Sequence, residues 1–141
     1  MVDTTKSIKK ENIPKLQDAL KHLVERFDIS QNGTHVSFQT FAKETTLHTT
    51  FDDATYHSKD AILSLISRPM SLSKPTRLDV ALKTTNERMF GDESGPRPGV
   101  QKALVLYTDG RSHPETEDFY MDVIAIKVRL KGYKIQRPSI S

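Results

Sequence analysis

The apolar residues between positions 13 and 27 recur at three- and four-residue steps, which is the pattern of an amphipathic helix. The apolar stripe consists of Ile13, Leu16, Ala19, Leu20, Leu23, Val24 and Phe27. Asn12 precedes the stripe and is expected to cap the helix. Pro14 suits the first turn, because an amide proton there has no helical partner to lose. Residues 28–33 are expected to form a loop.

Two further helices are predicted from the same kind of pattern. Ser58 is expected to be the N-cap of a short helix that ends at Arg68-Pro69. A second stripe begins at Leu78 and is expected to end near Gly91, ahead of a polar loop at residues 92–99.

Strands are predicted where polar and apolar residues alternate, and where an apolar run is continuous. Residues 35–41 and 45–51 are rich in Thr, Val and Phe and alternate roughly by two, so they predict an antiparallel hairpin. Residues 103–107, with the sequence Ala-Leu-Val-Leu-Tyr, are apolar without alternation. That pattern is expected of a strand buried on both faces of a mostly parallel sheet.

Residues 118–131 fit two periods. Ile124, Ile126 and Val128 alternate like a strand, whereas Tyr120, Ile124 and Val128 step like a helix. We interpret this segment as a helix that ends at Gly132, followed by a strand at residues 133–136.

The alternation of strands and helices around a buried strand predicts an α/β fold. We expect a doubly wound, mostly parallel central sheet with helices on both faces and one antiparallel edge hairpin strand. In such sheets, ligands bind beyond the carboxyl ends of the strands.

Composition narrows the classes of function. A chain of 141 residues suits one domain with an ordinary core. The formal net charge of +3 comes from 21 basic and 18 acidic residues spread along the chain, so nucleic-acid binding is not indicated. Cysteine is absent, which excludes disulfides and thiolate metal sites. No apolar stretch approaches the roughly 20 residues that span a bilayer.

Oxygen-bearing side chains gather at three places along the chain. Asp3, Thr5 and Ser7 alternate near its start, Thr76 precedes a predicted helix, and Asp109 follows the predicted buried strand. Taken singly, these residues are explained as turn and helix-cap residues. Taken together, their oxygens suit a hard divalent cation such as Mg²⁺, which binds oxygen ligands at about 2.1 Å in octahedral geometry.

Several segments of the chain resemble the von Willebrand factor type A domain family. They are Asp3-Thr4-Thr5-Lys6-Ser7-Ile8, Leu23-Val24-Glu25-Arg26-Phe27-Asp28, Thr76-Arg77-Leu78-Asp79-Val80-Ala81-Leu82 and Leu104-Val105-Leu106-Tyr107-Thr108-Asp109-Gly110-Arg111-Ser112. The similarity covers nearly the whole chain in the right order and spacing. It implies a Rossmann-like fold with a metal-ion-dependent adhesion site. In this family the site is an Asp-x-Ser-x-Ser loop, a Thr before the third helix and the Asp of a Thr-Asp-Gly strand end.

Matched residue by residue, the resemblance places Asp3, Thr5, Ser7, Thr76 and Asp109 around Mg²⁺ or Mn²⁺. Thr5 departs from the family's usual Ser. It keeps the hydroxyl oxygen and adds a methyl group to the coordination shell. In this family the metal commonly binds a Glu or Asp carboxylate from a protein ligand, so the resemblance implies an extracellular matrix or adhesion protein as partner.

The segment from Phe27-Asp28-Ile29 to Val36-Ser37-Phe38 is similar to the matrix and adhesion branch of the family, which includes matrilins and collagen-associated A domains. This implies a secreted protein of the extracellular matrix, whose signal peptide is not in this chain. Asn32-Gly33-Thr34 has the N-glycosylation acceptor pattern on a predicted surface loop, although a plain turn explains it equally well.

The family also sets an expectation for the ends of the domain. Its members begin with a buried apolar strand before the metal loop, and they continue through more elements after a strand like residues 133–136. Here Met1 and Val2 precede Asp3, and residues 137–141 are unlike that continuation. We therefore expect a domain at residues 1–136 with a tail at 137–141, in a fragment truncated at both ends.

Three functions remain open at this point. The leading hypothesis is a non-catalytic adhesion module that binds a protein ligand through a divalent cation, for example in an organic matrix around mineral. The first alternative is a structural A domain whose metal site is idle. The second is a phosphotransferase of the haloacid dehalogenase type, but that class needs an acid where this chain has Thr5. No nucleophile elbow or phosphate-binding glycine loop is present, so the sequence favours a protein that is not an enzyme.

Overall fold

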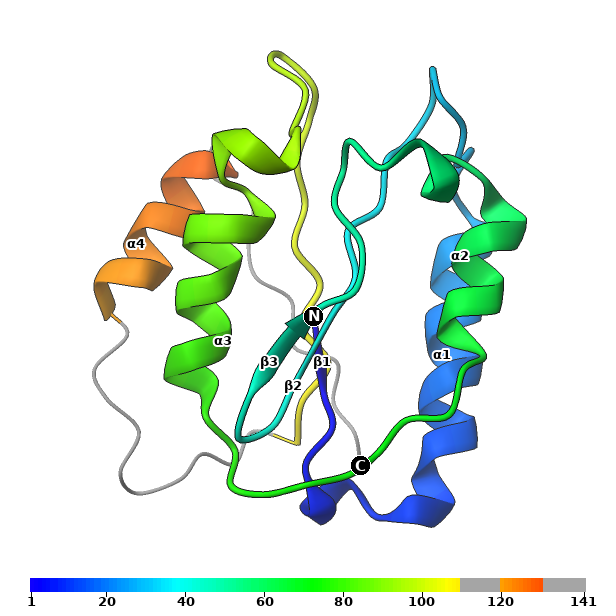
Figure 1. Ribbon diagram of the computed structural model, residues 1–141, viewed down its shortest axis with the longest axis vertical. Helices are drawn as coiled ribbons and strands as arrows, with labels where there is room; N and C mark the ends of the chain where they lie inside the picture. The colour runs from blue at the N-terminus through cyan, green and yellow to red at the C-terminus, as the bar shows by residue number, and fades with distance from the viewer. Residues whose placement is uncertain (110–119, 131–141) are drawn as a thin grey trace.

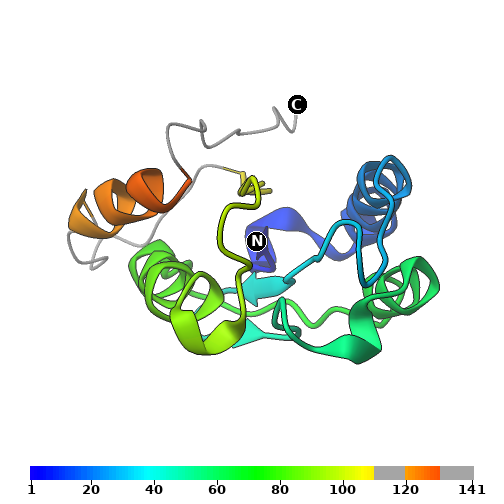
Figure 2. The ribbon, with the colours of Figure 1, turned by 90° about the horizontal axis from the view of Figure 1, so that it is seen from above.

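The structure is a computed structural model that describes residues 1–109 and 120–130. A small central sheet lies between two pairs of helices (Figures 1 and 2). The helices α1 (Ile13–Glu25) and α2 (Lys59–Ile66) cover one face, and α3 (Leu78–Thr84) and α4 (Tyr120–Arg129) cover the other. This arrangement confirms the predicted α/β architecture with helices on both faces.

The sheet is mixed, and its strands are short. β1 (Val2–Asp3) pairs in parallel with β2 (Gln39–Phe41), which pairs antiparallel with β3 (Thr45–Leu47). The predicted hairpin is therefore confirmed, with shorter paired regions than residues 35–41 and 45–51. On the other side of β1, Val2 forms a parallel bridge with Tyr107. The apolar segment at residues 103–107 thus lies beside β1, but it is joined by isolated bridges and is not a continuous strand. The expected burial on both faces is wrong, because Leu104 and Leu106 are buried in one cluster whereas Ala103 is exposed and Val105 and Tyr107 are half-buried.

The core occupies both faces of the sheet, because successive residues of a strand point to opposite sides. Val2 belongs to the cluster under α1 and α2, and Phe41 belongs to the cluster under α3 and α4. The first cluster contains Val2, Leu16, Leu20, Val24, Ile29, Phe38, Ile62, Leu65 and Ile66. The second contains Met1, Phe41, Ala81, Leu82, Met89, Phe90, Leu104, Leu106, Ile126 and Leu130. Because both faces of the sheet are packed, β1 and β2 are held in place, and the loops that follow them start from fixed positions.

The helix α1 follows its predicted stripe, but its predicted cap is wrong. Pro14 lies in the first turn, and Leu16, Leu20 and Val24 are buried. Asn12 is held in helical backbone geometry by the short 3₁₀ turn Lys10–Asn12 that leads into α1, whereas an N-cap normally has extended backbone. The Nδ2 of Asn12 therefore donates backwards to the carbonyl oxygen of Ile8 at 2.7 Å.

The other helices agree with the sequence in outline. Ser58 caps α2 as predicted, since its backbone is extended and its Oγ accepts from the amide of Ala61 at 3.4 Å. The stripe that begins at Leu78 forms α3 and then a wider π-helical segment at Thr85–Met89.

The ambiguous segment at residues 118–131 contains the helix α4, which confirms the helical interpretation. Gly132 and the strand predicted at residues 133–136 lie outside the described residues, as does the tail at 137–141. Within residues 1–109 and 120–130, no helix is long and apolar enough to cross a membrane.

Candidate metal centre

The loop after β1 brings three of the predicted ligands together. β1 is held on both edges, because the amide of Asp3 donates to the carbonyl oxygen of Tyr107 at 2.8 Å and the amide of Thr4 donates to that of Phe41 at 2.8 Å. The chain then tightens into a 3₁₀ turn at Lys6–Ile8. The strand end fixes Asp3 and Thr5, and the turn brings Ser7 back beside them.

A continuous series of oxygen contacts joins four of the five predicted ligands. The Oγ1 of Thr5 donates to the Oδ1 of Asp3 at 2.6 Å and lies 3.0 Å from the Oγ of Ser7. The Oγ of Ser7 in turn donates to the Oδ2 of Asp109 at 2.5 Å. Asp109 follows the extended segment at residues 103–107, so the contact connects the ends of two neighbouring parallel segments. The structure therefore places Asp3, Thr5, Ser7 and Asp109 in one cluster.

Thr108 is a further member of the cluster to which the sequence reasoning assigned no role. Its Oγ1 donates to the Oδ2 of Asp3 at 2.8 Å. The other oxygen of Asp3, Oδ1, accepts from both the amide and the hydroxyl of Thr5. The signal for Thr108 was its position directly before Asp109, at the end of the apolar segment at residues 103–107 that neighbours β1. Its hydroxyl orients the Asp3 carboxylate.

Thr76 is the predicted ligand that the structure does not join to the others. It is buried and lies just before α3, and no hydrogen bond among the described residues links its side chain to the other four. Its segment is nevertheless anchored to the metal loop. The amide of Lys6 donates to the carbonyl oxygen of Ser73 at 2.8 Å, and the amide of Ser73 donates to that of Thr4 at 3.1 Å. Thr76 thus lies three residues beyond Ser73, whose backbone pairs with the loop after β1.

The donor chemistry and spacing of the cluster fit a hard divalent cation. Ligands at about 2.1 Å that occupy neighbouring corners of an octahedron are about 3.0 Å apart, and the hydroxyl oxygens of Thr5 and Ser7 have that separation. A hydroxyl that donates to a carboxylate still has lone pairs to offer. No group of three or more His, Cys, Asp or Glu residues within the described part of the chain is arranged to hold a metal. A site here therefore depends on hydroxyl oxygens as well as on carboxylates.

The cluster is buried on one side, which we call its base, and open to solvent on the other. Asp3 and Thr5 are 0% and 2% exposed, whereas Ser7 is exposed and Asp109 is half-buried. The buried base keeps water away from the Asp3 carboxylate, so charge interactions there are stronger than in bulk water.

The predicted glycosylation acceptor lies far from this cluster in the sequence. Asn32 is exposed in a loop that is closed by the amide of Thr34 donating to the carbonyl oxygen of Asp28 at 2.7 Å. An exposed loop is accessible to a modifying enzyme, and glycosylation of Asn32 stays a prediction.

Helices cover both faces of the sheet, and a cluster of two carboxylates and several hydroxyls lies beyond the ends of its parallel segments. Together these features define an α/β domain with a candidate cation site. Residues 1–139 match the von Willebrand factor type A domain, and the chain belongs to that family. It is 25% identical over 138 residues to matrilin-3 of Gallus gallus, covering 96% of this chain and 29% of the relative. It is 31% identical over 132 residues to the collagen alpha-6(VI) chain of Mus musculus, covering 94% of this chain and 6% of that one.

Solved structures show the same fold. Proximal thread matrix protein 1 from the mussel byssus aligns with a TM-score of 0.81 and 25% identity, covering 96% of this chain and 36% of that chain. A second structure of the mussel protein has a zinc-occupied metal-ion-dependent adhesion site and aligns with a TM-score of 0.80 and 24% identity. This chain therefore corresponds to about a third or less of each of these proteins.

Proposed function

We propose that this chain is a non-catalytic adhesion module of the extracellular matrix that binds a protein ligand through a divalent cation. Asp3, Thr5, Ser7, Thr76 and Asp109 would hold the ion, and Mg²⁺ or Mn²⁺ suits their oxygens. The observation that carries the proposal is the series of contacts from Asp3 through Thr5 and Ser7 to Asp109. Matrilin-3, a collagen VI chain and a byssus matrix protein among the similar proteins support a matrix setting and a secreted protein.

Each residue of the cluster has a distinct part in this proposal. Thr108 and the amide of Thr5 hold the Asp3 carboxylate in a fixed orientation, so the site needs little rearrangement when the ion enters. Ser7 and Asp109 lie on the open side, where a carboxylate of the protein ligand can approach. A bound cation supplies positive charge that attracts that carboxylate. The mussel protein, which has been solved with zinc in this motif, supports the use of the site for a divalent ion.

A titration with Mg²⁺ and with Mn²⁺ tests the site. We expect Asp109→Asn to lose most of the affinity for either ion in calorimetry, because one of the two carboxylates of the cluster is gone. Asp18→Asn is the matched control, since Asp18 is exposed on α1. Equal affinity in the Asp109→Asn protein and the control would rule out the proposed ligand set.

Partner binding distinguishes this function from a domain with an idle metal site. Proteins of a matrix extract that are retained by the immobilised chain are identified by mass spectrometry with and without a chelator. Loss of the retained proteins on chelation supports cation-dependent adhesion. Retention that the chelator does not change would select the idle-site alternative.

Phosphotransfer through Asp3 is disfavoured by the geometry. A nucleophilic carboxylate must reach the substrate, but Asp3 is 0% exposed and both of its oxygens accept hydrogen bonds. Phosphatase activity that is lost in Asp3→Asn would contradict this conclusion.

A further inference from the structure

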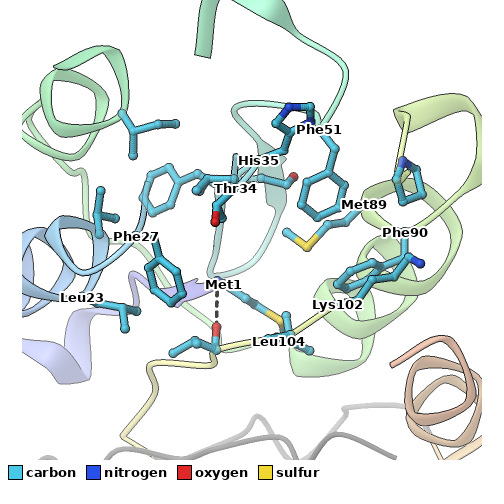
Figure 3. Close-up of a pocket in the computed structure, with 18 of the residues that line it drawn as sticks. Met1, Leu23, Phe27, Thr34, His35, Phe51, Met89, Phe90, Lys102 and Leu104 are labelled. Atoms are coloured by element: carbon cyan, nitrogen blue, oxygen red, sulfur yellow. Dashed lines mark hydrogen bonds between the residues drawn. The ribbon is translucent and has the colours of Figure 1, made fainter. Parts of the chain in front are cut away.

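A cavity with a partly polar wall lies beside the hairpin of β2 and β3. It differs from the cavity at the amino end of β1, whose walls are apolar and include Leu23 and Phe90 (Figure 3). The cavity beside the hairpin has a volume of about 520 Å³ and lies at the carboxyl end of β1. We call it the hairpin groove. Its walls are formed by Thr4, by residues of the hairpin at 38–48 and by residues of the segment at 65–74.

The hairpin groove lies where the helical cover of the sheet ends. Phe38 and Thr40 are two residues apart on one face of the hairpin, and Phe38 packs in the cluster under α1 and α2. The helix α2 ends at Ile66, and the chain then runs past the carboxyl ends of β1 and β2 toward α3 (Figure 1). Thr40 and its cross-strand partner Thr46 therefore line the groove, where they add hydroxyl groups to a wall that is otherwise partly apolar.

The rim of the hairpin groove is positively charged. Lys43 lies in the turn of the hairpin, and Arg68 and Lys74 lie in the segment after α2. All three side chains are exposed, and none forms an ion pair with a residue that the structure describes. Of the described residues that line the groove, only Glu44 is acidic. Three cations and one carboxylate give the rim a formal charge of +2, whereas the whole chain has +3.

The charge of the rim acts inside the hairpin groove, as His48 shows. The Nε2 of His48 lies 2.7 Å from the Oγ1 of Thr40, and the His48 ring is 5.2 Å from that of Phe38. Partial burial of the ring and the positive charge of Arg68 lower the pKa of His48. The groove therefore has a surplus of positive charge, which an acidic group of a ligand would offset.

The hairpin groove and the metal cluster share the loop after β1. Thr4 lines the groove, and its neighbours Asp3 and Thr5 belong to the cluster. Ser73 also lines the groove, and its amide and carbonyl oxygen are hydrogen-bonded to this loop. The strands β1, β2 and β3 are neighbours about 4.8 Å apart, so the groove begins about 5–10 Å from the cluster. An extended ligand covers that distance in two or three residues.

We propose that the hairpin groove binds acidic side chains of the same protein ligand whose carboxylate binds the cation. The ligand segment is extended, and it has Asp or Glu two or three residues from the metal-binding acid. Lys43, Arg68 and Lys74 attract these carboxylates, and the hydroxyl of Thr46 can donate a hydrogen bond to one of them. The identity of the ligand rests on the proposed function, whereas the preference for acids rests on the groove itself.

Two fluorescein-labelled peptides test the preference for acids. The acidic peptide is Gly-Asp-Asp-Gly-Glu-Gly-Asp-Asp-Gly, which has acids on both sides of the central Glu and so serves either chain direction. The amide peptide has Asn in place of each Asp. Each exposed ion pair changes an affinity by about 1.4- to 5-fold, and two or three can form. In fluorescence anisotropy with the 141-residue chain and excess Mg²⁺, we therefore expect the acidic peptide to have a Kd about tenfold lower. An equal Kd for both peptides would overturn the proposal.

Two triple variants locate the preference for acids. The groove variant combines Lys43→Gln, Arg68→Gln and Lys74→Gln. The control variant removes the same charges from the α3 and α4 side of the sheet, and it combines Lys83→Gln, Arg88→Gln and Lys127→Gln. All six positions are exposed, so both variants should fold. We expect the groove variant to bind the two peptides equally and the control to keep the tenfold preference. A preference that persists in the groove variant, or that is lost in both, would overturn the proposal.

The titration of His48 in nuclear magnetic resonance reports whether the acids enter the groove. A carboxylate near the imidazole favours its charged form. The acidic peptide should therefore raise the pKa of His48, and the amide peptide should not. An unchanged pKa with the acidic peptide bound would contradict the proposed location.

A chelator separates this inference from the proposed function. Removal of the cation should weaken the binding of both peptides, since each keeps the central Glu, and should leave the preference for acids in place. A preference for acids with no effect of the chelator would support the groove and contradict the cation-dependent function. Chelator-sensitive binding without that preference would overturn the inference alone. Displacement of the acidic peptide by a lower concentration of a sulfated oligosaccharide of equal charge would identify a glycan as the ligand and would also overturn the proposal.

Discussion

Replacing Thr5 by Val tests the core of the candidate metal centre. Valine keeps the branched shape of threonine and removes its hydroxyl. That hydroxyl donates to the Oδ1 of Asp3 at 2.6 Å, lies 3.0 Å from the Oγ of Ser7, and belongs to a residue that is 2% exposed. The substitution therefore removes one charge-assisted hydrogen bond and one proposed ligand oxygen with little change in packing.

The expected loss of stability follows from these contacts. A hydrogen bond to a charged group contributes about 1.5–3 kcal/mol. The Oδ1 of Asp3 keeps its bond from the amide of Thr5 at 2.9 Å, so the carboxylate is not left without a partner. We expect the free energy of unfolding of the metal-free Thr5→Val protein to fall by about 2 kcal/mol. Thr5→Ser, which keeps the hydroxyl and loses a methyl group, should lose about 1 kcal/mol.

The assay is urea unfolding, first with a chelator and then with excess Mg²⁺. An ion that binds the folded state stabilises it by about 2.7 kcal/mol at a hundred times Kd. The natural chain and Thr5→Ser should both gain this stability, whereas Thr5→Val should gain little or none. An equal gain in Thr5→Val would show that the Thr5 hydroxyl is not a ligand. An unchanged metal-free stability would refute the hydrogen-bond reasoning.

Three further predictions concern the stability of the fold. In a protein that begins at Met1, the buried amine has a pKa of about 5 against 8.0 for an ordinary amine, so the unfolded chain binds more protons between these values. Stability should therefore fall by about 4 kcal/mol as the pH decreases through this range, and N-terminal acetylation should remove the slope in urea unfolding. Ile62→Ala should cost about 2–5 kcal/mol in the same assay, because the side chain is 1% exposed and leaves a cavity. Gly95→Ala should lower the Tm more than Gly99→Ala. Both glycines have positive φ, but a Cβ at Gly95 would lie 2.3 Å from the Cβ of Asp52, whereas nothing lies within 4 Å of one at Gly99.

The features that the sequence predicted correctly are those determined by local periodicity. The stripe of Leu16, Leu20 and Val24 predicted α1, because a helix that packs on a sheet must bury one face. The proximity of Asp3 and Asp109 was also predictable, since both follow segments that run in parallel and end at the same edge of the sheet.

The features that the sequence did not predict depend on tertiary geometry. The contact between Thr108 and Asp3 arises from the register that pairs Val2 with Tyr107, and no local pattern encodes that register. Asn12 failed as a cap because the preceding turn fixed its backbone. The position of Thr76 relative to the cluster depends on the path of the segment around Ser73, which the sequence does not specify.

The contact between Ser7 and Asp109 joins residues that are 102 positions apart in the chain. An ion held by both residues would act as a reversible cross-link across that length. Cross-links of about 100 residues remove enough freedom from the unfolded chain to contribute about 4.7 kcal/mol in the chain-entropy model. Tension that pulls β1 away from residues 103–107 would therefore break the proposed cation site as it breaks the sheet, so adhesive strength and mechanical resistance would fail together.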